Sequence, residues 1–264
     1  MNALIFACDG VLAETHRDGH LTAFNRTFAE FGLPVRWSEA DYAGRLAAGG
    51  GEARIESVLT PEVSRAIALS DEPAVRAATV ARWHERKCAI FREIVRSGAL
   101  VPRPGVRRIA RAADTLGWRL AVVSTSDFES VAAVLELAVG PNLAARFAVF
   151  AGDVVAAKKP APDVDRFALD YLGLAPSDAL VVEADGDGVR AAVGAGLRCI
   201  VTASVDTRDD GLADALVVVS SLGDDDGEEA TVLANRANVS DAGVVTVETL
   251  CDCLAVGVVA PPMS

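Results

Sequence analysis

MNALIFACDGVLAET, residues 1–15, contains an apolar run that ends at an acid and a glycine. Residues 3–7 are apolar at every position, which predicts a parallel strand buried on both faces. Asp9 and Gly10 then pair a carboxylate with a residue that permits a tight turn. Ala7, two positions before Asp9, offers only a methyl group. The stretch predicts a strand that delivers one carboxylate to the edge of a sheet.

Similar apolar runs recur along the chain and alternate with helical patterns. Further strands are predicted at 120–124, 147–152, 179–184 and 198–204, with another at 213–220. Helices are predicted between them at 106–116, 128–137 and 162–172. Strands that alternate with helices form βαβ units, so the pattern predicts an α/β fold with a doubly wound parallel sheet.

The alternation is interrupted once, directly after the first strand. From about residue 16 to residue 98 the strand signals vanish and amphipathic helical patterns replace them. We therefore expect an α/β core formed by residues 1–15 and 99–222, with an inserted helical cap at 16–98. Residues 223–264 form a C-terminal appendage in this interpretation, and the sequence assigns it no role.

Charge and cysteine content restrict the functional classes. The chain has 25 Lys and Arg against 37 Asp and Glu, a net charge of −12, and no basic patch, so neither nucleic acid nor an anionic membrane is an expected partner. The short apolar run before Asp9 predicts neither a signal peptide nor a membrane span. Five cysteines without framework spacing favour reduced thiols and a cytoplasmic location. Cys251 and Cys253 form an isolated CxC, which favours two positions on a helix over a metal site.

Polar side chains follow four of the predicted strands. The carboxyl ends of parallel strands meet at one edge of a sheet, where ligands bind. The residues expected there are Asp9 after the first strand, Ser124, Thr125 and Ser126 after the second, 153–159 after the third, and Glu183 and Asp185 after the fourth. Hydroxyls, acids and a lysine together suit a phosphate.

Each of these motifs also has a structural interpretation. Ser124 and Thr125 could bind phosphate oxygens at a helix N-terminus, but small hydroxyl residues are also ordinary helix caps. Lys159 could offset the charge of a phosphoryl group, although a lysine before Pro160 also fits a solvated loop. The order in which the motifs occur together favours the functional interpretation.

This order resembles the haloacid dehalogenase superfamily with a helical cap, and within it the CbbY-type sugar-phosphate phosphatases, relatives of β-phosphoglucomutase. The resemblance covers about residues 1–220. The motifs that carry it are DG-VL-ET near the start, a hydroxyl after the second strand, KPAPD (159–163), GDGVRAAVGAG (186–196), RDGH (17–20), GGG (49–51), RPGV (103–106), VSTS (123–126) and AGDVV (151–155).

The resemblance implies an active site that uses Mg²⁺ and two aspartates separated by one residue. The first attacks phosphorus and forms an aspartyl-phosphate, and the second is the general acid and base. Asp9 matches the second aspartate, and Ala7 stands at the nucleophile position. The phosphate-binding matches are Ser124, Thr125 and Lys159. Glu183 matches the first of two acids that hold magnesium, and Ala184 stands where the second is expected.

The departures from the family pattern predict weak or absent Mg²⁺ binding. Ala7 and Ala184 each remove a carboxylate, whereas a hard dication needs several oxygen ligands. The remaining candidate ligands are Asp9, Glu183 and Asp185, with Asp187 as a further substitute. In the cap, the resemblance implies substrate contacts from Arg17, His20 and Arg54; Glu52 stands where the family generally has a lysine.

Three hypotheses remain open. The first is a CbbY-like protein that has lost most of its phosphatase chemistry, a pseudoenzyme that survives as a binding or regulatory protein. The second is a working Mg²⁺-dependent sugar-phosphate or bisphosphate phosphatase that uses Asp9, Glu183 and Asp185. The third is deliberate replacement at positions 7 and 184, against which the further departure at Glu52 argues. We favour the first, with a small phosphorylated sugar as the partner. The sequence does not specify the sugar or the oligomeric state, and a capped core of this size can stand alone.

Overall fold

The computed structural model forms two compact units, which we describe separately. The first, the core unit, comprises Met1–Glu14 and Val101–Ser264, and the second, the helical unit, comprises Thr15–Leu100. The structure describes residues 1–46, 50–152, 154–155, 157, 159–204, 207, 211–239 and 243–256. Gly49 and Asp153 of the quoted motifs, and Ala156 and Lys158 of the predicted segment 153–159, lie outside the described residues.

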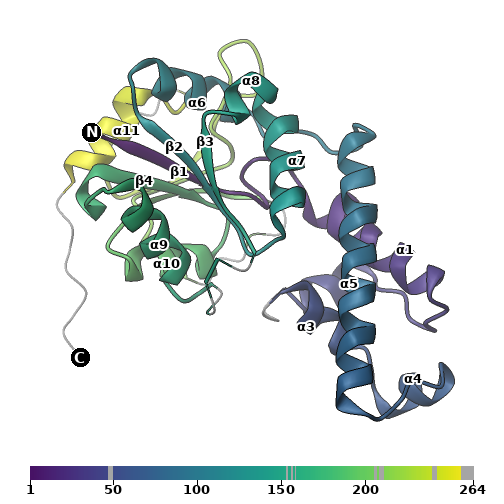
Figure 1. The fold of residues 1–264 in the computed structure, drawn as a ribbon. Coiled ribbons are helices and arrows are strands. Elements are labelled where there is room, and N and C mark those ends of the chain that lie inside the picture. Colours follow the sequence, from purple (N-terminus) through teal and green to yellow (C-terminus); the bar gives the residue numbers. More distant parts are fainter. Residues whose placement is uncertain are drawn as a thin grey trace. The chain divides into compact units, whose positions relative to one another are not determined.

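The core unit contains a seven-stranded sheet with the order β3-β2-β1-β4-β5-β6-β7 (Figure 1). The strands are β1 (Ala3–Ala7), β2 (Arg119–Val123), β3 (Phe147–Phe150), β4 (Ala179–Glu183), β5 (Arg198–Thr202), β6 (Val217–Val219) and β7 (Val232–Asn235). Every neighbouring pair is parallel except β6 and β7, which are antiparallel. The predicted α/β class with a mostly parallel sheet is confirmed, whereas β7 was not predicted.

Strand β1 lies inside the sheet, between β2 and β4. All of its residues are buried, which explains why the sequence at 3–7 is apolar throughout instead of alternating. In the register of the sheet, Ala7 pairs with Val123 and Val123 pairs with Phe150, while Phe6 pairs with Val182. The carboxyl ends of β1, β2, β3 and β4 therefore lie level at one edge.

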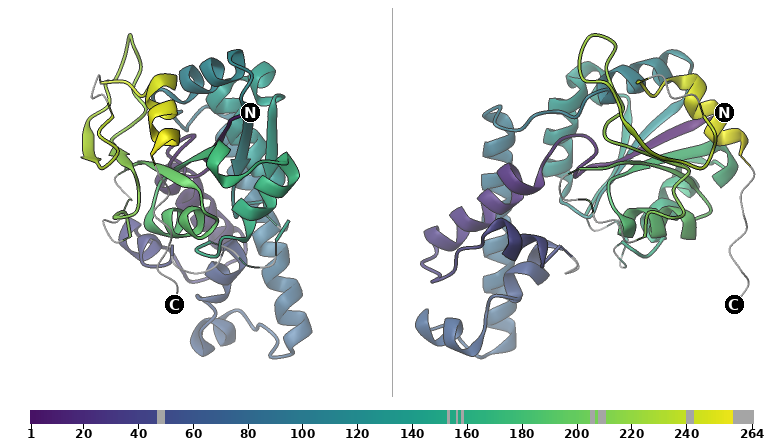
Figure 2. Two further views of the ribbon diagram at one scale, coloured as in Figure 1. Left: turned by 90° about the vertical axis from the view of Figure 1, so that its left-hand side faces the viewer. Right: turned by 180° about the vertical axis from the view of Figure 1, so that it is seen from behind.

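Helices cover both faces of this sheet (Figure 2). Their bounds are α6 (Val106–Thr115), α7 (Phe128–Val139), α8 (Pro141–Ala144), α9 (Asp163–Leu172), α10 (Gly186–Gly194) and α11 (Val247–Ala255), with a short 3₁₀ turn at Pro176–Asp178. Helices α9 and α10 pack side by side on one face, and α6 with α11 on the other (Figure 1). Ile5, Val123 and Val181 point into the apolar cluster beneath α9 and α10.

The C-terminal segment, interpreted from the sequence as an appendage, contributes β7 and α11 to the core unit. Arg108 attaches it, because its guanidinium donates to the carbonyls of Leu222, Gly223 and Val245. Arg103 donates to the carbonyls of Ala203 and Ser220, which precede this segment. Loop carbonyls have few backbone partners, so both arginines supply donors that such acceptors need when they are buried.

The helical unit is built around the long helix α5 (Pro73–Arg96). Its other elements are a π-helical segment at His16–Leu21 that runs into α1 (Thr22–Glu30), followed by α2 (Glu39–Ala43), α3 (Gly51–Glu56) and α4 (Pro61–Ala66). An aromatic cluster that includes Phe24, Phe28, Trp37 and Trp83 forms its core. Among the described residues no helix is both long enough and apolar enough to span a membrane.

Candidate functional site

The aligned carboxyl ends of β1, β2 and β4 bring most of the predicted site residues of the core unit to one edge. Asp9 follows β1, Ser124 follows β2 directly, and Glu183 is the last residue of β4. The loop after β1 is tight, because Gly10 has φ of +73° and donates its N–H to the Ala13 carbonyl at 3.1 Å. This turn holds Asp9 at the edge, half-buried.

Hydroxyl groups follow β2 as the sequence predicted. The Ser124 Oγ accepts a hydrogen bond from the Ser126 N–H at 3.1 Å, and the Ser126 hydroxyl donates to Asp9 Oδ2 at 3.4 Å. Thr125 is half-buried, and its hydroxyl makes no hydrogen bond with the residues that the structure describes. Asp127 caps α7 by accepting from the Ser130 N–H at 3.0 Å. The hydroxyls of Ser124 and Ser126 thus lie beside Asp9 rather than acting as the helix cap.

Lys159 and Glu183 form a buried ion pair at the same edge. The Glu183 carboxylate packs against Gly188 at the start of α10, where a Cβ would overlap it. Asp165, on α9, is 0% exposed, and neither of its carboxyl oxygens has a hydrogen-bond partner among the described residues. One lysine therefore faces two buried carboxyl groups.

Burial and mutual attraction shift the pKa values of this cluster. Burial raises the pKa of Glu183 to about 7, although Lys159 acts in the opposite direction. Burial also raises the pKa of Asp165, again against Lys159. Burial alone would lower the pKa of Lys159, but the carboxyl groups of Glu183, Asp165 and Asp185 outweigh it and raise that pKa. The lysine therefore keeps its charge at neutral pH.

The acidic stretch after β4 is engaged within its own helix. Asp185 caps α10 by accepting from the Gly188 N–H at 2.8 Å, and Asp187 forms an ion pair with Arg190 one turn later. Ala184 packs closely on the loop after β1, since a Cβ on Gly10 would lie 2.9 Å from the Ala184 Cβ. The two candidate substitutes for the missing magnesium ligand thus already have partners.

The donor set at this edge does not fit a magnesium ion. Ala7 and Ala184 supply no side-chain oxygen, and the Glu183 carboxylate is paired with Lys159. Within the described part of the chain, no group of three His, Cys, Asp or Glu side chains is arranged to hold a metal ion. Tight binding of a hard dication requires several oxygen ligands, usually anionic ones, so Asp9 alone is insufficient.

The predicted substrate residues of the helical unit differ in their surroundings. Arg17 forms an exposed ion pair with Glu39 at 2.9 Å. His20 is buried, stacks on the Phe91 ring at 4.1 Å between centroids, and lies with Nδ1 2.8 Å from the Lys87 Nζ. The two side chains thus form a buried polar contact inside the helical unit.

Arg54 is held by the backbone of its own unit. Its guanidinium donates to the carbonyls of Arg45 at 3.2 Å and Leu46 at 3.1 Å and lies 5.8 Å above the Tyr42 ring. Glu52, on the first turn of α3, lies with Oε1 3.8 Å from His84 Nδ1. The charge that departs from the family pattern therefore has a partner inside the helical unit.

Two buried charged residues were missed by the sequence interpretation. Lys87 lies between Trp83 and Phe91 at helical spacing, so its position in the apolar stripe of α5 was a readable signal. Asp165 similarly shares the stripe of α9 with Ala168 and Leu172. A charged residue at a core position of an amphipathic helix is rare without a partner, so the positions of Lys87 and Asp165 in the sequence indicate buried polar contacts.

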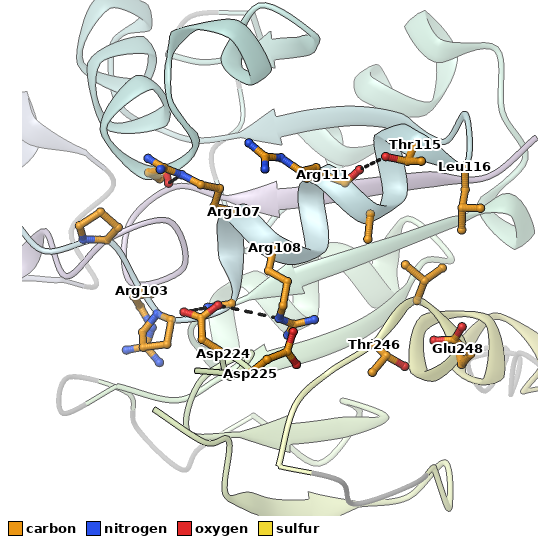
Figure 3. A pocket seen from close by; sticks show the side chains of 16 residues that line it. Arg103, Arg107, Arg108, Arg111, Thr115, Leu116, Asp224, Asp225, Thr246 and Glu248 are labelled. Atoms are coloured by element: carbon orange, nitrogen blue, oxygen red, sulfur yellow. Dashed lines mark hydrogen bonds and ion pairs between the residues drawn. The ribbon is translucent and has the colours of Figure 1, made fainter. Parts of the chain in front are cut away.

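A groove of about 1080 Å³ runs along α6 on the face that α11 covers (Figure 3). Arg108 points across it toward Asp224, whereas Arg107 and Arg111 extend from the other side of the helix. Asp224 accepts from the Gly105 N–H at 3.0 Å, and Arg108 is bound to backbone carbonyls. These groups hold the C-terminal segment in place, and the groove lacks the cluster of hydroxyls and lysine found at the sheet edge.

Comparison with known proteins identifies the family. Residues 1–196 match the family model described as haloacid dehalogenase-like hydrolase. The chain belongs to this family. A CBBY-like protein of Arabidopsis thaliana is 39% identical over 223 residues, which cover 84% of this chain and 70% of the relative. Protein CbbY of Cupriavidus necator is 36% identical over 85% of this chain and 87% of its own. These relatives place the chain in the CbbY-like branch of the family.

Solved structures agree with this assignment. The crystal structure of CbbY from Rhodobacter sphaeroides in complex with phosphate superposes with a TM-score of 0.73, at 35% identity, over 84% of this chain and 94% of that one. A second structure of that CbbY contains xylulose-(1,5)bisphosphate and has the same TM-score and coverage. A β-phosphoglucomutase-like structure from Thermotoga maritima reaches a TM-score of 0.58 at 26% identity, over 83% of this chain and 94% of its own.

Proposed function

We propose that this haloacid dehalogenase-like protein binds a phosphorylated sugar but does not transfer its phosphoryl group at an ordinary enzymatic rate. The observation that carries the proposal is the methyl group of Ala7 at the end of β1, where the family mechanism requires an attacking carboxylate. Loss of a covalent nucleophile lowers kcat by about 10⁴ to 10⁶. The protein then acts as a binding or regulatory protein.

Cys8 does not replace the missing nucleophile. Cys8 lies in the bend directly after β1, and its side chain is 2% exposed. The Cys8 thiol is buried, and burial, followed by the neighbouring charges of Asp9 and Asp127, raises its pKa well above the ordinary value. A thiol that stays protonated is a poor nucleophile at neutral pH.

The phosphate-binding part of the site supports retained ligand binding. The Ser124 and Thr125 hydroxyls lie after β2 near the start of α7, and Lys159 supplies a positive charge at the same edge. The CbbY of Rhodobacter sphaeroides has been solved with phosphate and with xylulose-(1,5)bisphosphate, so a sugar bisphosphate of this size is the first ligand to test. Arg17, His20 and Arg54 are the candidate substrate contacts of the helical unit.

Hydrolysis through rearranged acids is the competing function. It would require Asp9, Glu183 and Asp185 to assemble a magnesium site, and Glu183 and Asp185 are instead paired with Lys159 and with the α10 N-terminus. Ordinary turnover by the unmodified chain would demonstrate this alternative directly. It is therefore an outcome of the same experiment.

The test measures phosphate release and ligand binding in parallel. The unmodified protein and the Ala7→Asp/Ala184→Asp variant are assayed with Mg²⁺ against sugar monophosphates and bisphosphates. We expect the unmodified chain to stay below about a thousandth of an ordinary kcat of ~10 s⁻¹, and the double variant to exceed it by at least about 100-fold. Turnover by the unmodified chain above that limit would overturn the loss of catalysis.

Calorimetric titration with xylulose-(1,5)bisphosphate and with inorganic phosphate then tests binding. We expect heat of binding from the unmodified chain and about a tenfold weaker affinity in Ser124→Ala, because one hydroxyl contact is removed. Lys159→Met provides a second variant in which the positive charge is lost. Absence of binding to every sugar phosphate in a folded, unmodified protein would contradict the proposed role.

A further inference from the structure

Helix α5 presents a thiol and an imidazole to each other. His84 and Cys88 are one helical turn apart, and the Cys88 Sγ lies 3.6 Å from the His84 Nε2. This is within hydrogen-bond distance for sulfur, so the thiol can give its proton to the ring. A cysteine beside a histidine is the arrangement that converts a thiol into a reactive thiolate.

The start of α3 fixes the other side of the imidazole. Gly51 packs its backbone directly on the His84 ring, and a Cβ at that position would overlap Nε2. Glu52 follows and lies with Oε1 3.8 Å from His84 Nδ1. The carboxylate and the thiol therefore contact opposite nitrogens of one ring. A negative charge at Nδ1 stabilises the imidazolium that forms when Nε2 accepts the thiol proton.

The charges around this cluster favour the same proton transfer. Glu52 is the charged group that α3 brings to His84, and its side chain is 61% exposed. Lys87 precedes Cys88, but its ammonium is directed to His20 and lies over the Phe24 and Phe91 rings. The lysine side chain therefore lies in the aromatic interior of the helical unit.

The other cysteines have environments that suppress reactivity. Burial raises the pKa of Cys8 and Cys199 well above the ordinary value and that of Cys253 to about 12. The exposed Cys251 also has a raised pKa, because of partial burial and the adjacent acids Glu248 and Asp252. Within the described part of the chain, Cys88 is the cysteine whose sulfur contacts an imidazole.

We infer that Cys88 is a site of oxidative modification by hydroperoxides, activated by His84 and Glu52. In the reaction the thiolate attacks one peroxide oxygen, an S–O bond forms, and the O–O bond breaks. The sulfur loses two electrons, the peroxide gains them, and the departing hydroxide takes the proton held on His84 and leaves as water. The product is a sulfenic acid at Cys88. The residue is 6% exposed, and the 26% exposed His84 side chain marks the route by which a molecule as small as hydrogen peroxide reaches it.

The test uses the full chain with hydrogen peroxide and the sulfenic-acid probe dimedone, followed by tryptic mass spectrometry. Cleavage after Lys87 and Arg92 releases Cys88 in the short peptide CAIFR, separate from every other cysteine. At pH 7 we expect dimedone addition at Cys88 at least about tenfold faster than at Cys251, although Cys251 is more exposed. A Cys88 rate no greater than the Cys251 rate would overturn the inference.

Two variants test the activating groups. His84→Gln should slow oxidation of Cys88 by about tenfold or more and raise the apparent pKa in the pH profile of iodoacetamide alkylation, because the proton acceptor is lost. Glu52→Gln keeps the exposed side chain's shape, and should slow the reaction by about two- to fivefold. Cys251→Ser is the matched control and should leave the Cys88 rate unchanged.

Circular dichroism establishes whether each variant is folded. Should His84→Gln unfold, Glu52→Gln decides the result, because its exposed position tolerates the change. If the folded variants and the unmodified chain give the same rate of Cys88 oxidation and the same alkylation pH profile, His84 and Glu52 only pack against Cys88 and do not activate it.

Discussion

The Glu183 carboxylate fills the space that a side chain on Gly188 would need, since a Cβ there would overlap Oε2. Because the same carboxylate pairs with Lys159, the absence of a side chain at Gly188 allows the buried ion pair to form. Lys159 stabilises the negative charge of this carboxylate against the cost of burial.

Gly188→Ala should therefore separate Glu183 from Lys159. We expect the free energy of unfolding to fall by about 2 kcal/mol, since overpacking outweighs the gain of about 1 kcal/mol in helix propensity. Urea denaturation measures the change. Gly44→Ala is the control, because an added Cβ there makes only ordinary contacts at 3.5 Å and 3.6 Å. Equal stabilities of the two variants would show that Glu183 moves freely.

Asp165→Asn should stabilise the protein at high pH. Burial raises the folded-state pKa of Asp165, so the folded protein favours the protonated carboxyl. The stability that the carboxyl group contributes in this form is lost as the pH rises through the raised pKa. The asparagine amide carries no charge, so it avoids the cost of burying a carboxylate that has no hydrogen-bond partner among the described residues. We expect the free energy of unfolding to rise by about 1 to 3 kcal/mol at pH 8, and this difference to vanish toward pH 4. Thermal unfolding across that range measures the difference. A loss of stability at pH 8 would show that the ionised carboxylate is needed to hold Lys159.

Arg108→Ala should loosen the C-terminal segment. Its guanidinium donates to the carbonyls of Leu222, Gly223 and Val245, and truncation leaves these acceptors without it. We expect destabilisation of about 1 to 3 kcal/mol, with faster hydrogen exchange in the segment 220–239. Arg111→Ala, an exposed arginine on the same helix, is the matched control and should change stability by less than about 0.5 kcal/mol. Equal effects of the two truncations would contradict the attachment role.

Mg²⁺ at about 10 mM should leave the melting temperature of the unmodified chain unchanged and raise that of Ala7→Asp/Ala184→Asp. A ligand stabilises the folded state by RT ln(1 + [L]/Kd), so only the variant with the restored carboxylates should respond. Differential scanning calorimetry provides the measurement. Ca²⁺ in place of Mg²⁺ tests whether the restored site discriminates between dications. A clear shift of the unmodified chain would show that its remaining acids suffice.

The α/β class and the position of the sheet edge could be predicted from the sequence because they depend on local patterns. The apolar runs at 3–7 and 179–184 predicted buried strands, and parallel strands align their carboxyl ends. Strand β7 escaped prediction because Val232–Asn235 is short and partly exposed at the sheet edge, without the long apolar run of the central strands.

The partners of the site residues could not be predicted, because they depend on contacts distant in sequence. Nothing near Lys159 indicates that its charge is taken up by Glu183, or that Asp165 is buried beside them. The pairing of Glu52 with His84 likewise arises only when α3 packs on α5. The sequence identified Glu52 as a departure, and the fold supplies its partner.

The position of β1 inside the sheet has a consequence during synthesis. Its two neighbours, β2 and β4, begin only at Arg119 and Ala179, so β1 has both edges unpaired while the intervening helices are made. At ordinary translation rates the wait is roughly 10 to 40 s. Thr15–Leu100 is complete well before that, so the nascent chain carries a folded helical unit behind an exposed apolar strand, the species that chaperones would bind.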